Sequence, residues 1–257
     1  MQYLFSTRQW ESKIVAARRI FLFLDFDGTL SPIVKHPYQA HILPSLKTYL
    51  RSLSCRKNIV IVIISGRHRE DLIRRVGIRR GIIYFGWHGL KVRFRGKKRF
   101  LNTLVQIKAV VKKWRRHCSH LVKEDKEIIL ALHYRNLNSQ EKECWQKLKK
   151  ELARFAAAGS IQLGFGKKVL EIRPPQKFGK GEVVKELLKS KCRGREDLAI
   201  YIGDDLTDEE GFCALREKDL TIRVGYKKNS AARYFLRSTL EVEKVLGSLL
   251  NLKSEYN

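Results

Sequence analysis

The fold is decided by the stretch Ile20-Phe-Leu-Phe-Leu-Asp25-Phe-Asp27-Gly28-Thr29, in which five apolar residues run directly into two aspartates and a glycine. A short, continuous apolar run of this kind is typical of a strand that is buried on both faces of a parallel sheet. Gly28 permits a tight turn, so the carboxyl groups of Asp25 and Asp27 can address one site. The stretch therefore predicts a buried strand that ends in a cluster of acidic groups.

Two more apolar runs along the chain have the same form. Residues 59–64 run into the tripeptide Ser65-Gly-Arg, and residues 198–202 run into the segment 203–208, which reads Gly-Asp-Asp-Leu-Thr-Asp. Amphipathic helical patterns lie at 67–76, at 182–189 and at 238–250, and Ser238 with Glu241 forms a capping box in the last of them. This alternation of strands and helices predicts the α/β class with a doubly wound parallel sheet.

The polar clusters that follow the three predicted strands should share one edge of the sheet. In an open parallel sheet, ligands bind beyond the carboxyl ends of the strands. Asp25, Ser65 and Asp204 each follow such a strand, although about 180 residues separate the first from the last. We therefore expect one site built from all three.

The side chains expected at this site suit the chemistry of a phosphate ester. Carboxylates gathered in one place repel one another unless a cation neutralises them, and hard oxygen ligands suit Mg²⁺. Asp25 can act as the nucleophile towards phosphorus, and Asp27 can protonate the leaving alcohol. Ser65 and Lys180, which stands just before a predicted helix, can hold the phosphoryl oxygens.

The middle of the chain has a different pattern. Residues 90–95 alternate apolar and basic side chains, as in a sheet with one wet face. Helical stripes follow at 104–114 and 139–158, and further strands are predicted at 127–132 and 168–172. Because Gly and Pro punctuate both edges, we predict a smaller α+β domain at residues 88–174, inserted into a core formed by residues 1–87 and 175–257.

The charge of the chain is unusual, with 53 Lys and Arg against 26 acidic residues and a net charge of +27. Such a balance favours anionic partners. The basic residues are spread along the chain in short clusters, however, which indicates a general surface bias, so nucleic acid is not an expected partner. The five cysteines form no C-x-x-C pair, and no signal peptide or membrane span is apparent, so we expect a cytoplasmic protein without membrane association.

Four motifs together resemble those of the haloacid dehalogenase superfamily of phosphatases. They are D-x-D-G-T at 25–29, the hydroxyl residue Ser65, Lys180 before a helix, and G-D-D-x-x-D at 203–208. The resemblance implies Asp25 as nucleophile and Asp27 as general acid and base, with Ser65 and Lys180 supporting catalysis. It also implies that Mg²⁺ is held by Asp25, the carbonyl of Asp27 and Asp204, with Asp205 or Asp208 in support.

A narrower resemblance joins this core to the inserted domain. The segments Ser65-Gly-Arg, His88-Gly-Leu, His133-Tyr-Arg and Lys168-Val-Leu-Glu-Ile-Arg-Pro are similar to those of the trehalose-6-phosphate phosphatase family. In that family an α/β cap lies between the second and third motifs, and cap residues that match Lys168 and Glu171 recognise sugar hydroxyls. The substrate-binding residues that this resemblance implies are Gly66, Arg67, His88, Arg135, Lys168 and Glu171.

The expected activity is the Mg²⁺-dependent hydrolysis of trehalose 6-phosphate to trehalose and phosphate through an aspartyl-phosphate. Such an enzyme would serve trehalose biosynthesis beside a trehalose-6-phosphate synthase. The family commonly has Glu shortly after the His-Gly-Leu segment, where this chain has Lys91, so another sugar phosphate such as sucrose phosphate or mannosyl-phosphoglycerate stays open as the substrate. The alternative from another class is a nucleic-acid-binding protein that uses its charge of +27 on a phosphatase scaffold.

Overall fold

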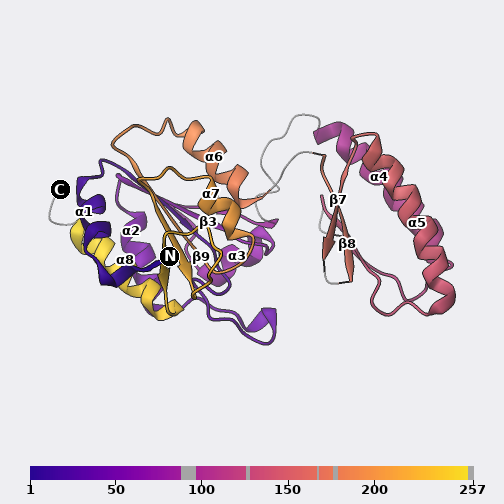
Figure 1. Cartoon of the computed structure of the whole chain (residues 1–257), viewed down its shortest axis with the longest axis horizontal. Helices are drawn as coiled ribbons and strands as arrows, with labels where there is room; N and C mark the ends of the chain where they lie inside the picture. Colours follow the sequence, from indigo (N-terminus) through magenta and orange to yellow (C-terminus); the bar gives the residue numbers. More distant parts are fainter. Residues whose placement is uncertain (88–96, 126–127, 167, 176–178, 254–257) are drawn as a thin grey trace. The chain divides into compact units, whose positions relative to one another are not determined.

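The structure is a computed structural model that describes residues 1–87, 97–125, 128–166, 168–175 and 179–253. These residues form two compact units (Figure 1). The first unit joins residues 1–87 to residues 179–253, and the second contains the described residues between 97 and 175. The first unit thus consists of two segments that are distant in the sequence.

The first unit is built on a parallel sheet of seven strands among the described residues, in the order β1-β11-β10-β9-β2-β3-β4. The register pairs Ile20 of β2 with Ile59 of β3 on one side and with Leu198 of β9 on the other. The strands are β1 (Gln2–Tyr3), β2 (Ile20–Leu24), β3 (Ile59–Ile64), β4 (Ile82–Phe85), β9 (Leu198–Gly203), β10 (Leu220–Val224) and β11 (Tyr234–Leu236).

Both faces of this sheet are covered by helices, which is why its central strands read as continuous apolar runs. Alternate residues such as Leu22 pack with α1, α2, α3 and α8 in one apolar core. On the opposite face Tyr201 stacks on Phe23 and meets Phe212 of α7 edge-on. Figure 1 shows α1, α2 and α8 grouped together and α6 beside α7. The helices are α1 (Gln9–Ala16), α2 (Pro44–Ser54), α3 (Arg69–Val76), α6 (Lys180–Ser190), α7 (Asp208–Cys213) and α8 (Thr239–Leu252), and η1 (Leu4–Ser6) and η2 (Pro37–Gln39) are short 3₁₀ helices.

The direction of chain travel reverses at the centre of the sheet. From β2 the chain proceeds outward through β3 to β4, and after the second unit it returns on the other side of β2 as β9 and β10. The junction of β2 and β9 is therefore the topological switch point, where ligands bind in sheets of this type. The predicted fold class, a doubly wound parallel core with a smaller second domain, is confirmed.

The second unit contains an antiparallel sheet with the strand order β5-β6-β8-β7. Leu132 of β6 and Leu170 of β8 pair on one face and are fully buried, whereas Ala131 and Glu171 pair on the other. Figure 1 shows α4 and α5 side by side against this sheet. The elements are α4 (Lys97–Arg115), β5 (Val122–Asp125), β6 (Leu130–His133), α5 (Ser139–Ala157), β7 (Gln162–Gly166) and β8 (Val169–Arg173). The boundaries that the sequence predicts, 87/88 and 174/175, stay predictions.

Several strands were missed or displaced in the sequence analysis. The strand expected at 127–132 begins at Leu130, and the alternating segment at 90–95 lies outside the described residues. Strand β5 was not predicted because all four of its side chains are exposed, which leaves no apolar pattern. Strand β7 was missed because two glycines interrupt it, at 164 and 166. The outer strands β1, β4, β10 and β11 of the first sheet were also not predicted.

The boundaries of α3, α5, α6 and α8 differ by at most two residues from those predicted, whereas α4 begins at Lys97, seven residues before the predicted stripe at 104–114. One capping box was wrong. Helix α3 begins at Arg69 because the ring of His68 caps it, accepting the backbone N–H of Glu70 at 3.3 Å. Ser238 makes no capping hydrogen bond through its side chain. Glu241 instead accepts hydrogen bonds from the backbone N–H of Arg237 and from the hydroxyl of Tyr3. In the part of the chain that the structure describes, no helix combines the length and apolar character needed to cross a membrane.

Candidate active site

Three of the polar clusters predicted from the sequence lie at the ends of neighbouring strands, because β9, β2 and β3 are adjacent in the sheet. Asp25 is the first residue after β2, and its backbone N–H donates to the carbonyl of Ile202 at 3.0 Å. Ser65 is the first residue after β3, and Asp204 is the first after β9. The parallel sheet thus brings three separate parts of the sequence to one edge.

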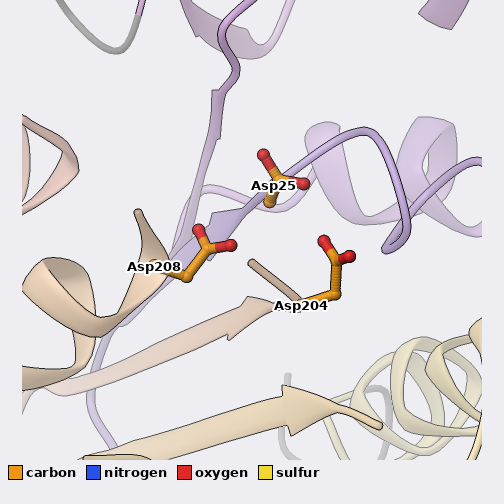
Figure 2. A group of neighbouring side chains, drawn as sticks. All are labelled: Asp25, Asp204 and Asp208. Atoms are coloured by element: carbon orange, nitrogen blue, oxygen red, sulfur yellow. The ribbon is translucent and has the colours of Figure 1, made fainter. Parts of the chain in front are cut away.

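A cluster of three carboxylates lies at this edge (Figure 2). Asp25, Asp204 and Asp208 each offer an oxygen, and these atoms lie within 4.8 Å of one another. Asp208 is the first residue of α7 and is fully buried, and Asp25 is only 5% exposed. Figure 2 shows the three side chains converging from the end of β2, the end of β9 and the start of α7.

A buried lysine neutralises part of this charge. The Lys180 ammonium, at the first residue of α6, donates to Asp25 Oδ1 and to Asp208 Oδ1, both at 2.6 Å. Asp208 also accepts the hydroxyl of Tyr201 at 2.8 Å and the backbone N–H of Asp205 at 3.0 Å. Of the two aspartates that the sequence left open as metal supports, Asp208 lies in the cluster, whereas Asp205 orients it through its backbone.

Burial and the neighbouring charges both shift the pKa values of the cluster. Burial raises the pKa of Asp25 well above its usual range, and Asp208 and Asp204 add to this effect while Lys180 opposes it. Burial and then the charge of Asp208 raise the pKa of Asp204 to about 6. Burial alone would lower the pKa of Lys180, but the two carboxylates outweigh it and hold that pKa above its usual value.

The cluster fits a hard divalent cation. When all three carboxylates are ionised, their charge exceeds that of the one ammonium by two units, which a divalent ion would cancel. Asp204 Oδ1 is buried and has no hydrogen-bond partner among the described residues, although a buried carboxylate oxygen normally has one. All the donors are oxygens, as Mg²⁺ prefers. The side chain of Asp27 lies outside this cluster. This agrees with the family resemblance, which implies that Asp27 would contribute its backbone carbonyl to the metal.

Two glycines make room for the carboxylates. Gly28 has a φ of +82°, which favours glycine, and a Cβ there would lie 2.1 Å from Asp204 Oδ2. A Cβ on Gly203 would lie 2.2 Å from the carboxyl carbon of Asp208. The backbone N–H of Gly28 donates to the carbonyl of Ser31 at 2.7 Å, which closes the tight turn expected after Asp27.

The side chain of Asp27 is not part of the carboxylate cluster and pairs with an arginine. Arg67 donates from Nε to Asp27 Oδ2 at 2.8 Å and from Nη2 to Asp27 Oδ1 at 2.6 Å. Its third nitrogen donates to Asp71 at 3.3 Å. Ser65 is buried, and its hydroxyl oxygen accepts the backbone N–H of Arg67 across Gly66. The sequence predicted that Arg67 binds substrate, but in this structure its guanidinium is occupied by two carboxylates of the protein.

The predicted substrate-binding residues of the second unit are only partly gathered. Arg135 and Lys168 line a cavity of about 370 Å³ within that unit, beside the aromatic rings of Tyr134, Trp145 and Phe165. Glu171 is not among the lining residues of this cavity; it lies in β8 and forms an ion pair with Arg173. His88 lies outside the described residues.

Tyr201, which orients Asp208 from the middle of β9, was not predicted from the sequence as part of the site. Its hydroxyl is buried with the carboxylates, and burial followed by the charges of Asp208 and Asp25 raises the pKa of that phenol. The signal was present in the sequence, because Tyr201 is the one residue with a polar atom in its side chain in the apolar run 198–202. A buried phenol usually finds a hydrogen-bond partner, and here the partner is the carboxylate seven residues on.

Comparison with solved structures supports the fold. The chain resembles a trehalose-6-phosphate phosphatase from Aspergillus fumigatus with a TM-score of 0.74 and 23% identity, covering 94% of this chain and 96% of that one. It also resembles a haloacid dehalogenase-like hydrolase from Bacteroides thetaiotaomicron with a TM-score of 0.62 and 15% identity, covering 89% of this chain and 98% of that one. At these identities the likeness concerns the fold alone.

Comparison of sequences shows the family. Residues 23–239 match the family described as trehalose-phosphatase. The chain is 30% identical to trehalose 6-phosphate phosphatase RA3 of Zea mays over 95% of this chain and 74% of that protein. It is 31% identical to the probable trehalose-phosphate phosphatase 3 of Oryza sativa over 96% of this chain and 75% of that protein. The carboxylate cluster and these matches agree, and the chain belongs to the trehalose-phosphatase family of phosphoric monoester hydrolases.

Proposed function

We propose that this protein hydrolyses trehalose 6-phosphate to trehalose and inorganic phosphate in a Mg²⁺-dependent reaction. The observation that carries the proposal is the buried group of Asp25, Asp208 and Lys180 at the switch point of the sheet, with Asp204 beside it. The relatives in maize and rice are named as trehalose-phosphate phosphatases, which supports this substrate. The charge shortage of the cluster supports the cation.

The reaction would proceed in two displacements at phosphorus. In the first, a carboxylate oxygen of Asp25 attacks phosphorus, and the sugar oxygen leaves with a proton from Asp27. In the second, Asp27 takes a proton from water as that water attacks the aspartyl-phosphate, which releases phosphate and restores Asp25. The half-exposed side chain of Asp27 supports this role, since at 45% exposure it can reach both the leaving group and water.

The residues around Asp25 would prepare it for attack. Lys180 holds Asp25 Oδ1 in place, and its ammonium lies where it can also attract a phosphoryl oxygen. Asp208 anchors the lysine from the other side and is itself held by Tyr201. The hydroxyl of Ser65, at the end of the neighbouring strand, would bind a second phosphoryl oxygen. Each of these groups is held by its own contacts before substrate arrives, which lowers the reorganisation that catalysis requires.

Mg²⁺ would be held by Asp25, Asp204 and the carbonyl of Asp27, with Asp208 in support. When bound, it would supply positive charge to the carboxylates and to the phosphoryl oxygens. Within the described part of the chain the buried oxygen Oδ1 of Asp204 lacks a hydrogen-bond partner, which supports this assignment because coordination would satisfy it.

The second unit would recognise the sugar by acting as a cap. Gly66, in the segment Ser65-Gly-Arg, and His88, in the segment His88-Gly-Leu, would also contribute to substrate binding. The cavity lined by Arg135 and Lys168 supports a role in binding an anionic sugar. Glu171 pairs with Ala131 on the face of the antiparallel sheet opposite to the buried pair Leu132 and Leu170. It would contribute to the recognition of sugar hydroxyls. The same reaction would allow the protein to act after a synthase that produces the sugar phosphate. A cytoplasmic location is supported by the five cysteines, all of which are unpaired.

The decisive experiment measures phosphate release from trehalose 6-phosphate with and without Mg²⁺. We expect turnover with Mg²⁺, loss of turnover after chelation, and restoration when the ion is added back. Asp25→Asn should abolish turnover while retaining the fold, because the amide is the same size but is not a nucleophile. Full activity of Asp25→Asn would contradict the proposed chemistry, and activity unaffected by chelation would contradict the assignment of the metal.

A substrate panel tests the sugar separately from the chemistry. Trehalose 6-phosphate, sucrose phosphate and mannosyl-phosphoglycerate would be compared by kcat/KM under the same conditions. We expect trehalose 6-phosphate to be preferred, and Lys168→Ala to lower that preference more than it lowers the rate for a small ester such as p-nitrophenyl phosphate. Equal turnover of all three sugar phosphates would leave the phosphatase mechanism intact and exclude trehalose 6-phosphate as the specific substrate.

A further inference from the structure

The edge of the core sheet opposite the candidate active site is strongly basic. Because the sheet is parallel, the loops that enter its strands lie together at the amino end. The five loops before β10, β9, β2, β3 and β4 contain eleven Lys and Arg residues against four acidic residues. These loops are Ala-Leu-Arg-Glu-Lys-Asp (214–219), Lys-Cys-Arg-Gly-Arg-Glu-Asp (191–197), Ala-Arg-Arg (17–19), Cys-Arg-Lys-Asn (55–58) and Gly-Ile-Arg-Arg-Gly (77–81).

The two acidic residues that are buried in these loops are already neutralised. Asp197 pairs with Arg19 at 2.7 Å, and Asp219 pairs with Arg193. Only Glu196 and Glu217 present exposed carboxylates, whereas eight of the cations are exposed. The charge that an incoming molecule meets at this edge is therefore strongly positive.

Hydrogen bonds also link four of the five loops, so that their charges lie on one surface. The backbone N–H of Arg18 donates to the carbonyl of Glu196 at 3.1 Å. The backbone N–H of Ile20 donates to the carbonyl of Asn58 at 2.9 Å. The side chain of Arg216 donates to the carbonyl of Gly194 at 3.4 Å. We call this surface, made of the five loops, the basic edge.

Helix dipoles explain only part of the basic edge. In a doubly wound fold the helices end where the strands begin, and a cation near a helix C-terminus interacts favourably with the helix dipole. That effect is confined to the last turn of a helix. In all five loops the cations stand beyond the last residue of the preceding helix, which for Arg79 and Arg80 is Val76 of α3. The excess of charge requires another explanation.

The basic edge contains a cavity that can receive an anionic group. Its volume is about 440 Å³, and Arg18, Arg19 and Arg195 line it together with Glu196 and Asp197. Arg19 already neutralises Asp197. The remaining charged residues of the cavity are Arg18, Arg195 and Glu196, so its lining has a net positive charge. A phosphate group matches the planar donors that arginine presents.

The composition of the loops favours duplex nucleic acid over other polyanions. None of the five loops contains Phe, Tyr or Trp, so they offer no ring on which an unpaired base can stack. None of the large exposed apolar side chains of the described residues belongs to these loops, so they offer nothing to insert into a lipid surface. Five adjacent strands span roughly 19 Å at the usual strand spacing. A duplex of that length carries about eleven phosphate charges.

We propose that the basic edge binds the phosphate backbone of double-stranded nucleic acid without sequence preference. The sequence alone argued against nucleic acid because the basic residues are spread along the chain, and the fold collects a set of them at one edge. The basic edge precedes the strands and the carboxylate cluster follows them, so the two lie at opposite ends of the sheet. Strands β2, β3 and β9, each of five or six residues, separate them. Binding at the one leaves the other open, and the two activities are independent.

The test measures binding of the full chain to a fluorescent, random-sequence duplex DNA of about two helical turns by anisotropy. The variant replaces one exposed cation in each of four loops by glutamine: Arg18→Gln, Lys57→Gln, Arg80→Gln and Arg195→Gln. A matched control replaces four exposed cations of the second unit: Lys112→Gln, Lys113→Gln, Arg116→Gln and Lys150→Gln. Both variants have the same net charge, so a difference between them reports location alone.

We expect the wild-type chain to bind with a Kd on the order of 10⁻⁶ to 10⁻⁴ M at physiological salt, with log K falling against log salt with a slope of about −4 for four to five phosphate contacts. The basic-edge variant should bind at least about tenfold more weakly and show a smaller slope, whereas the control should change by less than about twofold. Phosphatase activity of the basic-edge variant should equal that of the wild type. Asp25→Asn should bind DNA normally, which separates this proposal from the proposed function.

Three outcomes would overturn the proposal. Equal weakening of both variants would mean that net charge alone drives binding. Tighter binding to a single strand of the same length would contradict the inference from the missing aromatic residues. Tighter binding to vesicles of phosphatidylcholine and phosphatidylserine than to the duplex would identify the basic edge as a lipid-binding surface instead.

Discussion

The two ends of the core sheet carry opposite charge and have opposite character. At the carboxyl end, Asp25, Asp204 and Asp208 gather around one lysine, and two of these carboxylates are buried. At the amino end, eleven cations stand on five loops, and most of them are exposed. The difference teaches that a parallel sheet sorts residues by whether they precede or follow a strand, a distinction that a count of charges along the sequence does not reveal.

The polarity of the helices supports this separation. Helix N-termini lie at the carboxyl end of the sheet and carry partial positive charge, while helix C-termini lie at the amino end and carry partial negative charge. The first turn of α7 accordingly holds Asp208, Glu209 and Glu210, and the acidic residues of α3 stand in its first turn as well. The same polarity that favours carboxylates near the candidate active site favours cations at the basic edge.

The contrast between the two ends of the sheet predicts its largest effect for Lys180, at the carboxyl end. Lys180→Met removes the ammonium between Asp25 and Asp208 and leaves two buried carboxylates without their partner. We expect kcat to fall by about 10³-fold or more, since Asp25 loses its orientation and the phosphoryl group loses a cation. Breaking a buried ion pair from one side also costs about 3–5 kcal/mol of stability. Steady-state kinetics and chemical denaturation measure the two effects.

The control for this prediction lies in the same helix. Lys185→Met removes a lysine whose side chain is 59% exposed and whose ion pair with Glu182 is at the surface. An exposed ion pair contributes about 0–1 kcal/mol, so neither kcat nor stability should change appreciably. If both variants lost activity to the same extent, the loss would belong to α6 as a whole, and the special place of Lys180 would be refuted.

The amino end should behave in the opposite way, losing stability without losing activity. Asp219 is fully buried and accepts hydrogen bonds from Arg193 and from the backbone N–H groups of Ala199 and Arg216. Asp219→Asn leaves the Arg193 guanidinium without its ionised partner, so we expect a loss of about 2–4 kcal/mol by denaturation. The kcat/KM of the folded fraction should stay at the wild-type value. Glu217→Gln, an exposed residue of the same loop, should change neither, and a drop in kcat/KM for Asp219→Asn would contradict the division of roles.

A smaller effect at the carboxyl end is expected from Arg67. Its two short hydrogen bonds fix the carboxylate of Asp27 in one plane, which a lysine cannot do because its ammonium is a point charge. We expect Arg67→Lys to lower kcat by about tenfold with little change in KM, since Asp27 would be misplaced and not removed. A rise in KM with unchanged kcat would instead support the prediction from the sequence that Arg67 binds substrate. Arg74→Lys, an exposed neighbour in α3, is the matched control.

The core and its site could be predicted from the sequence because their physical signals are strong. Strands β2, β3 and β9 are buried on both faces, so their residues form unbroken apolar runs, and the aspartates that follow them stand out by contrast. Lys180 was found because it stands between two glycines at the start of a helix. Both glycines approach Glu210 so closely that a side chain at either position would clash with it.

The remainder could not be predicted because its signals are weak or non-local. The four residues of β5 are all exposed and two are acidic, which resembles a loop, and only pairing with β6 makes them a strand. The capping box was placed at Ser238, whereas the structure has one at Asn138 with Glu141. Hydrogen-bond partners such as Arg67 with Asp27 join segments 40 residues apart, and no local pattern in the sequence reports them.

The last prediction concerns the charge shortage of the carboxylate cluster and is the smallest in size. The pKa of Asp204 is raised from 3.8 to about 6, so between these values the folded metal-free protein binds more protons than the unfolded chain. Stability therefore falls as pH rises from about 4 through about 6, the reverse of the usual behaviour of a carboxylate. The proposed Mg²⁺ would bind the ionised form, so its stabilising effect should be small at pH 4.5 and full at pH 7.

Thermal unfolding with a chelator and with excess Mg²⁺ at the two pH values measures this linkage. We expect Mg²⁺ to raise the Tm of the wild-type protein by a few degrees at pH 7 and much less at pH 4.5, since about 1 kcal/mol corresponds to about 2–4 °C for a chain of this size. Asp204→Asn cannot ionise at that position, so it should lose most of the response to Mg²⁺ and part of the decline in stability with pH. An equal response to Mg²⁺ in both proteins would show that the ion is held elsewhere, and the acidic end of the sheet would then lose its assigned cation.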